Sequence, residues 1–231
     1  MKKGFTMAEV LIVIGIIGII AAMTLPAIIA KYKSMVVATQ LKKLYSVTSQ
    51  AMLKAVPDGD FENIPIADGG YTGVRNFYDF YLKKQFNTIH ECLEIDEGGC
   101  WALTKNRDGK TNYSGTSGFG SGIIGFVTVD GYNFSIDTWT VSDWERVKRY
   151  FGVNVTGKTH MAVIHVDANG MKGPNVIGKD VFVFVLSEKG LTPAGSDKTD
   201  EEIEEECKTT GRYCFAKIMR NNWTVDPKDA W

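Results

Sequence analysis

The sequence predicts an α+β protein in which one long N-terminal helix packs on an antiparallel β-sheet. Three observations predict this class. An apolar run opens the chain, an apolar stripe with helical spacing continues it, and β-rich segments joined by an Asp-Gly turn follow in the second half. About 175 residues follow the long helix, which is enough for one ordinary hydrophobic core. We therefore expect a single folded head after the helix.

The apolar run extends from Phe5 to Leu25 and follows a short leader, residues 1–4, that carries two lysines. As a helix the run is about 31 Å long, which matches a hydrocarbon core of about 30 Å. The lysines predict that the N-terminal end stays in the cytoplasm, so that everything after Pro26 is exported. A plain signal-anchor is the alternative, and it leaves the single carboxylate of the run, Glu9, without a role.

The first 26 residues resemble the type IV pilin and pseudopilin class. The resemblance rests on Gly4, Phe5, Thr6, Glu9, the unbroken apolar helix and Pro26. It implies that a membrane-bound prepilin peptidase cuts between Gly4 and Phe5 and that Phe5 is then N-methylated. It also implies that Glu9 pairs with the terminal amine of Phe5 in a neighbouring subunit, which neutralises two charges inside the lipid.

The same resemblance implies a pilin-like fold and a filament function. The protein would first be a single-pass inner-membrane protein with its head in the periplasm, and would then join a pilus or pseudopilus filament. Its partners would be copies of itself and other pilins, the peptidase and an inner-membrane assembly platform. The leading hypothesis is a structural subunit of a type IV pilus or a type II secretion pseudopilus. The alternative is a low-copy minor pilin whose head binds a surface, DNA or an assembly partner.

The expected organisation has four parts: a leader (1–4), a transmembrane and assembly helix (5–26), a head-packed continuation of that helix (27–56) and an exported globular head (57–231). The continuation is predicted from apolar positions at steps of three and four: Val37, Leu41, Leu44, Thr48, Ala51 or Met52, and Ala55. Pro57, Asp58 and Gly59 should end the helix.

Three residues in the first half of the helix disfavour helical structure. Pro26 removes a backbone hydrogen bond, and Gly15 and Gly18 are entropically costly in a helix. The resemblance implies that the stretch between such a glycine and the proline melts as the subunit leaves the membrane. A simple bend is the alternative.

Residues 57–121 predict a connecting region with one short helix, followed at its end by a glycine-rich loop from Tyr113 to Gly122. The helix should bury an aromatic face made of Val74, Phe77, Tyr78, Tyr81 and Leu82. Strands are expected at 123–129, 132–136, 160–166 and 181–186, with a type I′ turn at Asp130-Gly131 between the first two.

Two further helices are predicted. One should begin at Asp143, and another in the acidic run 200–206, where Thr199 and Glu202 have the spacing of a capping box. In the tail, an apolar stretch is predicted to form a strand, and Trp223 and Trp231 are expected to dock on the sheet.

Four cysteines lie in the exported part, and their even number suits an oxidising compartment: Cys92, Cys100, Cys207 and Cys214. Three pairings are possible, and the short spacings favour Cys92 with Cys100 and Cys207 with Cys214. A zinc site is the competing interpretation, but the intervals do not fit and no histidine stands at ligand spacing beside the cysteines.

One loop offers oxygen ligands for a metal ion. Asp167, Asn169 and Asp180, with backbone carbonyls, could enclose calcium on a glycine-rich loop, although the pattern departs from an EF-hand. The alternative is a turn in which Asn and Gly supply unusual φ values and the Asp side chains cap the backbone. Calcium is the only cofactor that the sequence suggests.

Charge and histidine content argue against several functions. The net charge is −1, and it becomes −3 once the two leader lysines are removed, which argues against general nucleic-acid binding. The histidines, His90, His160 and His165, have neither triad nor metal spacing. The sequence therefore predicts no catalytic residues and no enzyme.

Overall fold

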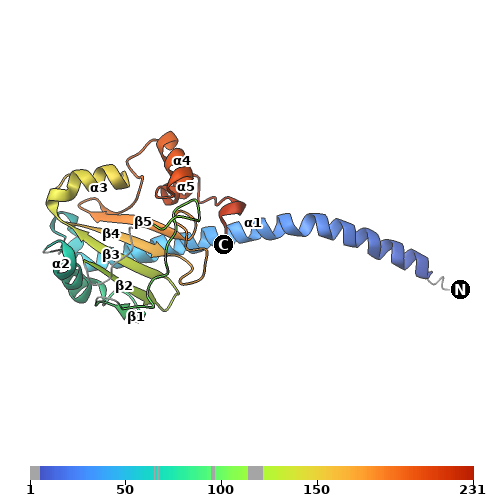
Figure 1. Ribbon diagram of the computed structural model, residues 1–231, viewed down its shortest axis with the longest axis horizontal. Coiled ribbons are helices and arrows are strands. Elements are labelled where there is room, and N and C mark those ends of the chain that lie inside the picture. The colour runs from blue at the N-terminus through green and yellow to red at the C-terminus, as the bar shows by residue number, and fades with distance from the viewer. Residues whose placement is uncertain (1–5, 65, 67, 95–96, 114–121) are drawn as a thin grey trace.

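The computed structural model describes residues 6–64, 66, 68–94, 97–113 and 122–231. A long helix, α1 (Met7–Ala55), packs its C-terminal half on a six-stranded antiparallel sheet, and its N-terminal half projects far from the head (Figure 1). The α+β, pilin-like class is therefore confirmed. The leader, Phe5 and most of the predicted loop at 113–122 lie outside the described residues.

Helix α1 has 49 residues, which is about 73 Å of helix. It begins after a capping box at Thr6 and ends at Ala55, and its C-cap Val56 directly precedes the predicted stop at Pro57. Its buried residues are Ser34, Val37, Leu41, Leu44, Thr48, Ala51, Met52 and Ala55. This confirms the predicted helical stripe, because residues three and four apart share one face of a helix.

The sheet is a meander in which each strand pairs with the next in the chain. The strands are β1 (Thr88–Cys92), β2 (Ile123–Thr128), β3 (Asn133–Trp139), β4 (Met161–Asp167), β5 (Val181–Ser187) and β6 (Gly190–Pro193). The four predicted strands are β2 to β5. The two edge strands were not predicted, because β1 is largely polar and β6 is only four residues long and contains Gly and Pro.

Both faces of the sheet are covered by helices. On one face, the buried stripe of α1 packs with residues such as Phe126, Phe134 and Phe184. On the other face, residues of β4 and β5 such as Val163 and Val183 pack with α3 (Trp144–Phe151) and α4 (Asp200–Thr209). Neighbouring residues of a strand point to opposite faces of the sheet. Because both faces are covered at β4 and β5, every residue of these two strands is buried.

The remaining helices agree with the sequence except in the tail. Helix α2 (Gly70–Phe77) continues as the π-helical turn η3 (Tyr78–Leu82), and Val74 and Phe77 are buried as predicted. Helix α3 follows its N-cap Asp143, and α4 has the predicted Thr199–Glu202 capping box.

The apolar stretch of the tail is a helix, α5 (Cys214–Arg220), so the strand predicted there is wrong. A disulfide from α4 holds its first residue, and Phe215 turns inward against Phe184. The predicted docking on the sheet is confirmed for Trp231, which packs on Phe182 of β5. Trp223 instead packs on Phe215 of α5 and on Tyr45 of α1. The last turn, η6 (Pro227–Asp229), lies against α1, close to where α1 leaves the head (Figure 1).

The β2–β3 turn differs from the predicted type I′ turn. Only Gly131 of the Asp-Gly pair has a positive φ, 85°, and its N–H donates to the Thr128 carbonyl at 2.9 Å. This hydrogen bond closes a four-residue turn one position earlier than expected. Asp130 then keeps an ordinary negative φ, and only glycine takes the left-handed conformation, which costs it little.

Candidate functional site: the uncovered half of α1

Residues 7–29 of α1 form an apolar surface that the rest of the described chain does not cover. Their large hydrophobic side chains are 45% to 82% exposed. An 18-residue window of this helix has a mean hydropathy of 2.7, and none of the window is buried. Such a surface is too large to stay in water, so it must lie in lipid or against other protein chains. We call residues 7–29 the bare half of α1.

The bare half is helical throughout, including at Gly15, Gly18 and Pro26. A β-carbon added at either glycine would meet nothing within 4 Å in the part of the chain that the structure describes. The glycines are therefore not required for packing inside this subunit. Pro26 has no N–H, so the helix lacks one backbone hydrogen bond there. Melting of this stretch during export stays a prediction.

Glu9 lies at the first turn of the bare half, where Thr6 holds its carboxylate. Glu9 Oε2 accepts hydrogen bonds from the backbone N–H and the hydroxyl of Thr6, both at 2.8 Å, and the Glu9 N–H donates to Thr6 Oγ1 at 3.3 Å. Among the described residues, none donates to the other oxygen, Oε1. The cap thus fixes the carboxylate and leaves one oxygen available to a further donor. Gly4 and Phe5, the predicted processing residues, lie outside the described residues.

The cysteines form two local disulfides, Cys92 with Cys100 and Cys207 with Cys214. This is the pairing that the short spacings favour. All four side chains are buried. The sequence did not show that His90 lies beside the first pair, with its Nε2 2.9 Å from the Gly98 carbonyl oxygen. Sulfurs that are bonded to each other are not thiolates, so this arrangement does not provide a zinc site.

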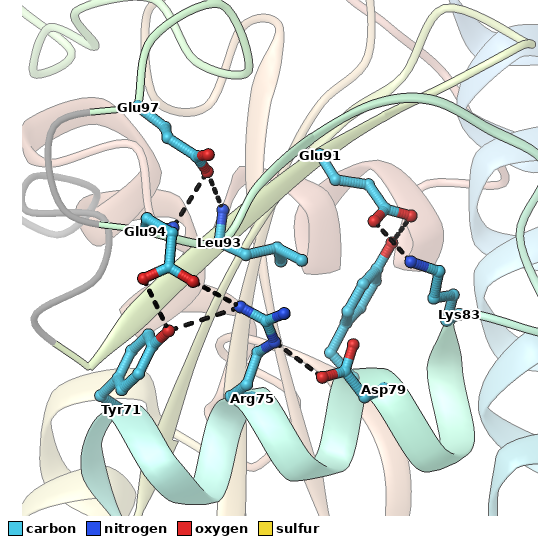
Figure 2. A network of polar contacts seen from close by, with 9 residues as sticks. Tyr71, Arg75, Asp79, Lys83, Glu91, Leu93, Glu94 and Glu97 are labelled. Carbon is cyan, nitrogen blue, oxygen red and sulfur yellow. Dashed lines mark hydrogen bonds and ion pairs between the residues drawn. The ribbon is translucent and has the colours of Figure 1, made fainter.

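A polar network joins α2 to the chain that follows β1 (Figure 2). Arg75 of α2 lies between two carboxylates, with Nε 2.7 Å from Asp79 Oδ2 and Nη1 3.0 Å from Glu94 Oε1. The Glu97 carboxylate accepts the backbone N–H groups of Leu93 and Glu94, inside the loop that the first disulfide closes. These contacts hold the loop against α2.

Glu91 of β1 makes a second set of contacts in the same network (Figure 2). It accepts hydrogen bonds from the hydroxyl of buried Tyr78 and from Lys83 Nζ, both at 2.7 Å. Partial burial raises the pKa of Glu91, but the bonds from Lys83 and Tyr78 outweigh it and lower the pKa below its usual value. These ionised contacts therefore brace the turn η3, which continues α2, against the edge strand β1.

The three residues predicted as calcium ligands lie around the loop that joins β4 to β5. Asp167 and Asp180 are almost completely buried, with exposed fractions of 2% and 0%. The backbone N–H of Asn169 donates to Asp167 Oδ1 at 3.1 Å. Burial, and then the nearby charge of Asp180, raise the pKa of Asp167 to about 8. Burial raises the pKa of Asp180 as well.

A comparison with protein-family models matches residues 1–25 to the prokaryotic N-terminal methylation motif, the signature of type IV pilins and pseudopilins. Searches of curated proteins and of solved structures found no significant match. Residues 7–25 of the match lie on the bare half of α1 and include Glu9. The motif implies assembly with other pilins into filaments, and together with the apolar helix it suits membrane anchoring before assembly. A structural subunit is what such a motif indicates.

Proposed function

We propose that this protein is a structural subunit of a type IV pilus or of a type II secretion pseudopilus. It is inserted in the inner membrane, cleaved after Gly4 by a prepilin peptidase, N-methylated at Phe5 and polymerised through an inner-membrane assembly platform. The observation that carries the proposal is the methylation motif on a helix whose apolar half is bare. Lipid covers this half before assembly, and the helices of other subunits cover it in the filament.

The position of Glu9 supports a role in assembly. A carboxylate at membrane depth is costly unless a cation or strong donors compensate it. Thr6 donates two hydrogen bonds to one carboxylate oxygen of Glu9 within the subunit. The second oxygen can accept a hydrogen bond from the terminal amine of Phe5 in a neighbouring subunit. Because that amine would otherwise also be unpaired in lipid, each added subunit removes two unfavourable charges. The pair would also set the axial position of the new subunit.

Substitution of Glu9 tests this role. Glu9→Gln keeps a side-chain oxygen that can accept from Thr6 but removes the charge, and Glu9→Leu removes both. Both variants should insert, be cleaved after Gly4 and fold their heads, yet the yield of sheared filaments should fall sharply in both. Met7→Leu, an apolar exchange in the same turn, is the matched control and should assemble normally. Wild-type filament yield from processed Glu9→Gln would show that the charge pair does not drive assembly.

Processing is tested separately from assembly. Gly4→Val should block cleavage, because the peptidase of this family requires the small residue at that position, and the chain should accumulate as the uncleaved form. Mass spectrometry of the wild-type N-terminus should find methylated Phe5. A mature N-terminus beyond Leu25 would instead identify an ordinary cleaved signal and overturn the proposed function.

A further inference from the structure

Three segments lie together at the end of the head from which the bare half of α1 projects. The turn η6 lies against α1, close to where α1 leaves the head (Figure 1). Arg107 joins η6 to two loops, since its Nη2 lies 2.7 Å from Asp229 Oδ1 and its Nη1 donates to the Gly178 carbonyl at 3.1 Å. We call these segments, residues 105–112, the β4–β5 loop (168–180) and η6, the base of the head.

The opposite end of the head faces away from the bare half. Helix α1 ends at Ala55, and Glu62 Oε1, in the segment that follows, lies 3.9 Å from the Nζ of Lys158, which precedes β4. Strand β4 begins at this end and reaches the base at Asp167, where the β4–β5 loop begins. Helix α1 therefore runs along the length of the head, with Ser34 near the base and Ala55 at the far end.

The base lies close to the level at which α1 leaves the lipid. Lys31 is the first charged residue after the bare half, and Ser34 is the first buried residue of α1. They are separated by about 5 Å of helix. The polar headgroup region of one leaflet is about 5 to 7 Å thick. When the bare half spans the hydrocarbon core, the base therefore meets the lipid headgroups.

The base and the adjoining turn of α1 carry lysines without an acidic partner. These lysines are exposed and form no ion pair within the part of the chain that the structure describes, and we call them the base lysines: Lys31, Lys33, Lys110 and Lys172. The acidic residues of the base are already engaged, since Asp229 pairs with Arg107. Asp108 and Asp180 accept backbone N–H groups. The base therefore presents unpaired positive charge, although the net charge of the whole chain is −1.

Two exposed side chains beside these lysines suit the boundary between lipid and water. Tyr32 lies between Lys31 and Lys33 in the chain and is 66% exposed. Met171 directly precedes Lys172 on the β4–β5 loop and is 50% exposed. Tyrosine is enriched at membrane interfaces, and a lysine stem can lie along apolar groups while its ammonium group stays in the polar layer. The base thus combines apolar side chains with positive charge at the level of the headgroups.

We propose that the base of the head docks on an anionic lipid bilayer, with the base lysines binding headgroup phosphates and Met171 entering the headgroup region. Docking rests on the proposed function, because the base reaches the bilayer only if the bare half spans it. Lysine binds phosphate as a point charge, so this surface recognises negative charge and not one particular lipid. Docking holds the head in one orientation on the outer leaflet of the inner membrane until α1 is withdrawn into a filament.

The test uses the full-length chain reconstituted in vesicles of phosphatidylcholine, with or without phosphatidylglycerol. Met171→Cys carries the fluorophore NBD, which attaches only to this thiol because the native cysteines are bonded in pairs. A nitroxide on the lipid headgroups should quench most of its emission when phosphatidylglycerol is present. Val141→Cys, labelled in the same way, is the matched control. Val141 is exposed and shortly follows the end of β3 that pairs with the start of β4, so its label should keep its emission.

The role of charge is tested in the Met171→Cys chain. Lys172→Glu should reduce the quenching, because it replaces a phosphate ligand with a like charge. Lys158→Glu, the same exchange at an exposed position of the far end, should leave the quenching unchanged. In about 1 M salt the Debye length is about 3 Å, so quenching should fall to the level found without phosphatidylglycerol.

Insertion of the helix is measured separately, with labelled Ile17→Cys and a nitroxide placed deep in the acyl chains. A label at position 17 that is not quenched would show that the bare half does not enter the bilayer, and would overturn the proposed function and the docking with it. An inserted chain whose label at position 171 is quenched no more than the label at position 141 would overturn the docking alone. So would quenching that is equal in both kinds of vesicle and insensitive to Lys172→Glu, because the helix alone would then hold the base near the lipid.

Discussion

His165 shows how one buried residue can make stability depend on pH. It lies on β4 with an exposed fraction of 2%, and its Nε2 is 2.9 Å from the hydroxyl of Tyr113, which is also buried. Burial lowers the pKa of His165 from 6.5 to about 3, because the charged ring would lose its hydration. The ring is therefore neutral in the folded protein over the whole physiological range.

The sign of the effect follows from where the proton binds. Below pH 6.5 the unfolded histidine takes up a proton, whereas the folded one does not until about pH 3, so acid favours unfolding. Two buried carboxyl groups have the opposite effect, since burial raises the pKa of Asp137 to about 6 and that of Asp167 to about 8. The folded state binds these protons more readily than the unfolded state does, so acid favours folding through these two groups. The effect of His165 must therefore be measured as a difference between two chains.

We predict that His165→Gln reduces the loss of stability in acid. Between about pH 6.5 and about pH 5, the free energy of unfolding of the wild type should fall by about 1.4 kcal/mol per pH unit more than that of the variant. Glutamine stays neutral and can still bond to the Tyr113 hydroxyl. Urea unfolding at a series of pH values measures both slopes. Equal slopes would mean that His165 is protonated in the folded state.

Single residues were predictable where their role depends on local spacing. The favoured disulfide pairs follow from separations of eight and seven residues, and both pairs are present. The contact of His90 with Gly98 depends on how a loop folds back, which spacing does not give.

At the scale of elements, α1 has two halves with opposite surroundings. The second half buries one face against the sheet, and Leu44 on that face is fully buried, while Leu53 on the same half is 52% exposed. Burial of the face, and not helix propensity, should thus stabilise this half in the head.

Alanine substitutions measure this difference. Leu44→Ala should lower the free energy of unfolding of the head by about 2–5 kcal/mol, because it removes buried methyl groups and leaves a cavity. Leu53→Ala, the same exchange at an exposed position of the same helix, should change it by less than about 1 kcal/mol. Thermal or urea unfolding compares them. Similar losses for the two variants would contradict the packing of α1 described here.

The disulfide between Cys207 and Cys214 joins the last turn of α4 to the first turn of α5. Replacing both cysteines with serine should cost about 2–3 kcal/mol, the value expected from the entropy of a short loop. Reduction of the wild type should lower its stability by a similar amount or more, because it also opens the other disulfide. Non-reducing peptide mapping checks the pairing, and four free thiols in the exported protein would refute it.

Elements were predictable where an apolar pattern extends over many residues or where a capping motif marks the start of a helix. The stripe of α1, the apolar runs of β4 and β5 and the capping box of α4 are all of this kind. Strands β1 and β6 were missed, because β1 is largely polar and β6 is only four residues long. Helix α5 was missed, because it is a short apolar segment whose period does not separate helix from strand.

At the scale of the whole molecule, the head and the bare half of α1 are physically independent parts. The head contains both disulfides, both faces of the sheet and the hydrophobic core, whereas the bare half contributes no buried residue to that core. Lipid or neighbouring subunits must cover the bare half, but the head needs neither. This separation suits a subunit that folds its head outside the membrane before its helix joins a filament.

The separation predicts that a chain beginning at Ala30 folds without membrane or partner. Buried residues of α1 begin at Ser34, so this truncation removes the bare half and keeps the stripe that covers the sheet. The fragment should sediment as a soluble monomer, and its melting temperature should match that of the full-length chain in detergent within about 2–4 °C, the shift that about 1 kcal/mol produces in a domain of this size. A fragment that aggregates or lacks cooperative unfolding would show that the bare half is needed for folding of the head. A fragment that folds but still forms filaments would show that contacts between heads suffice for assembly, and the role proposed for Glu9 would then be wrong.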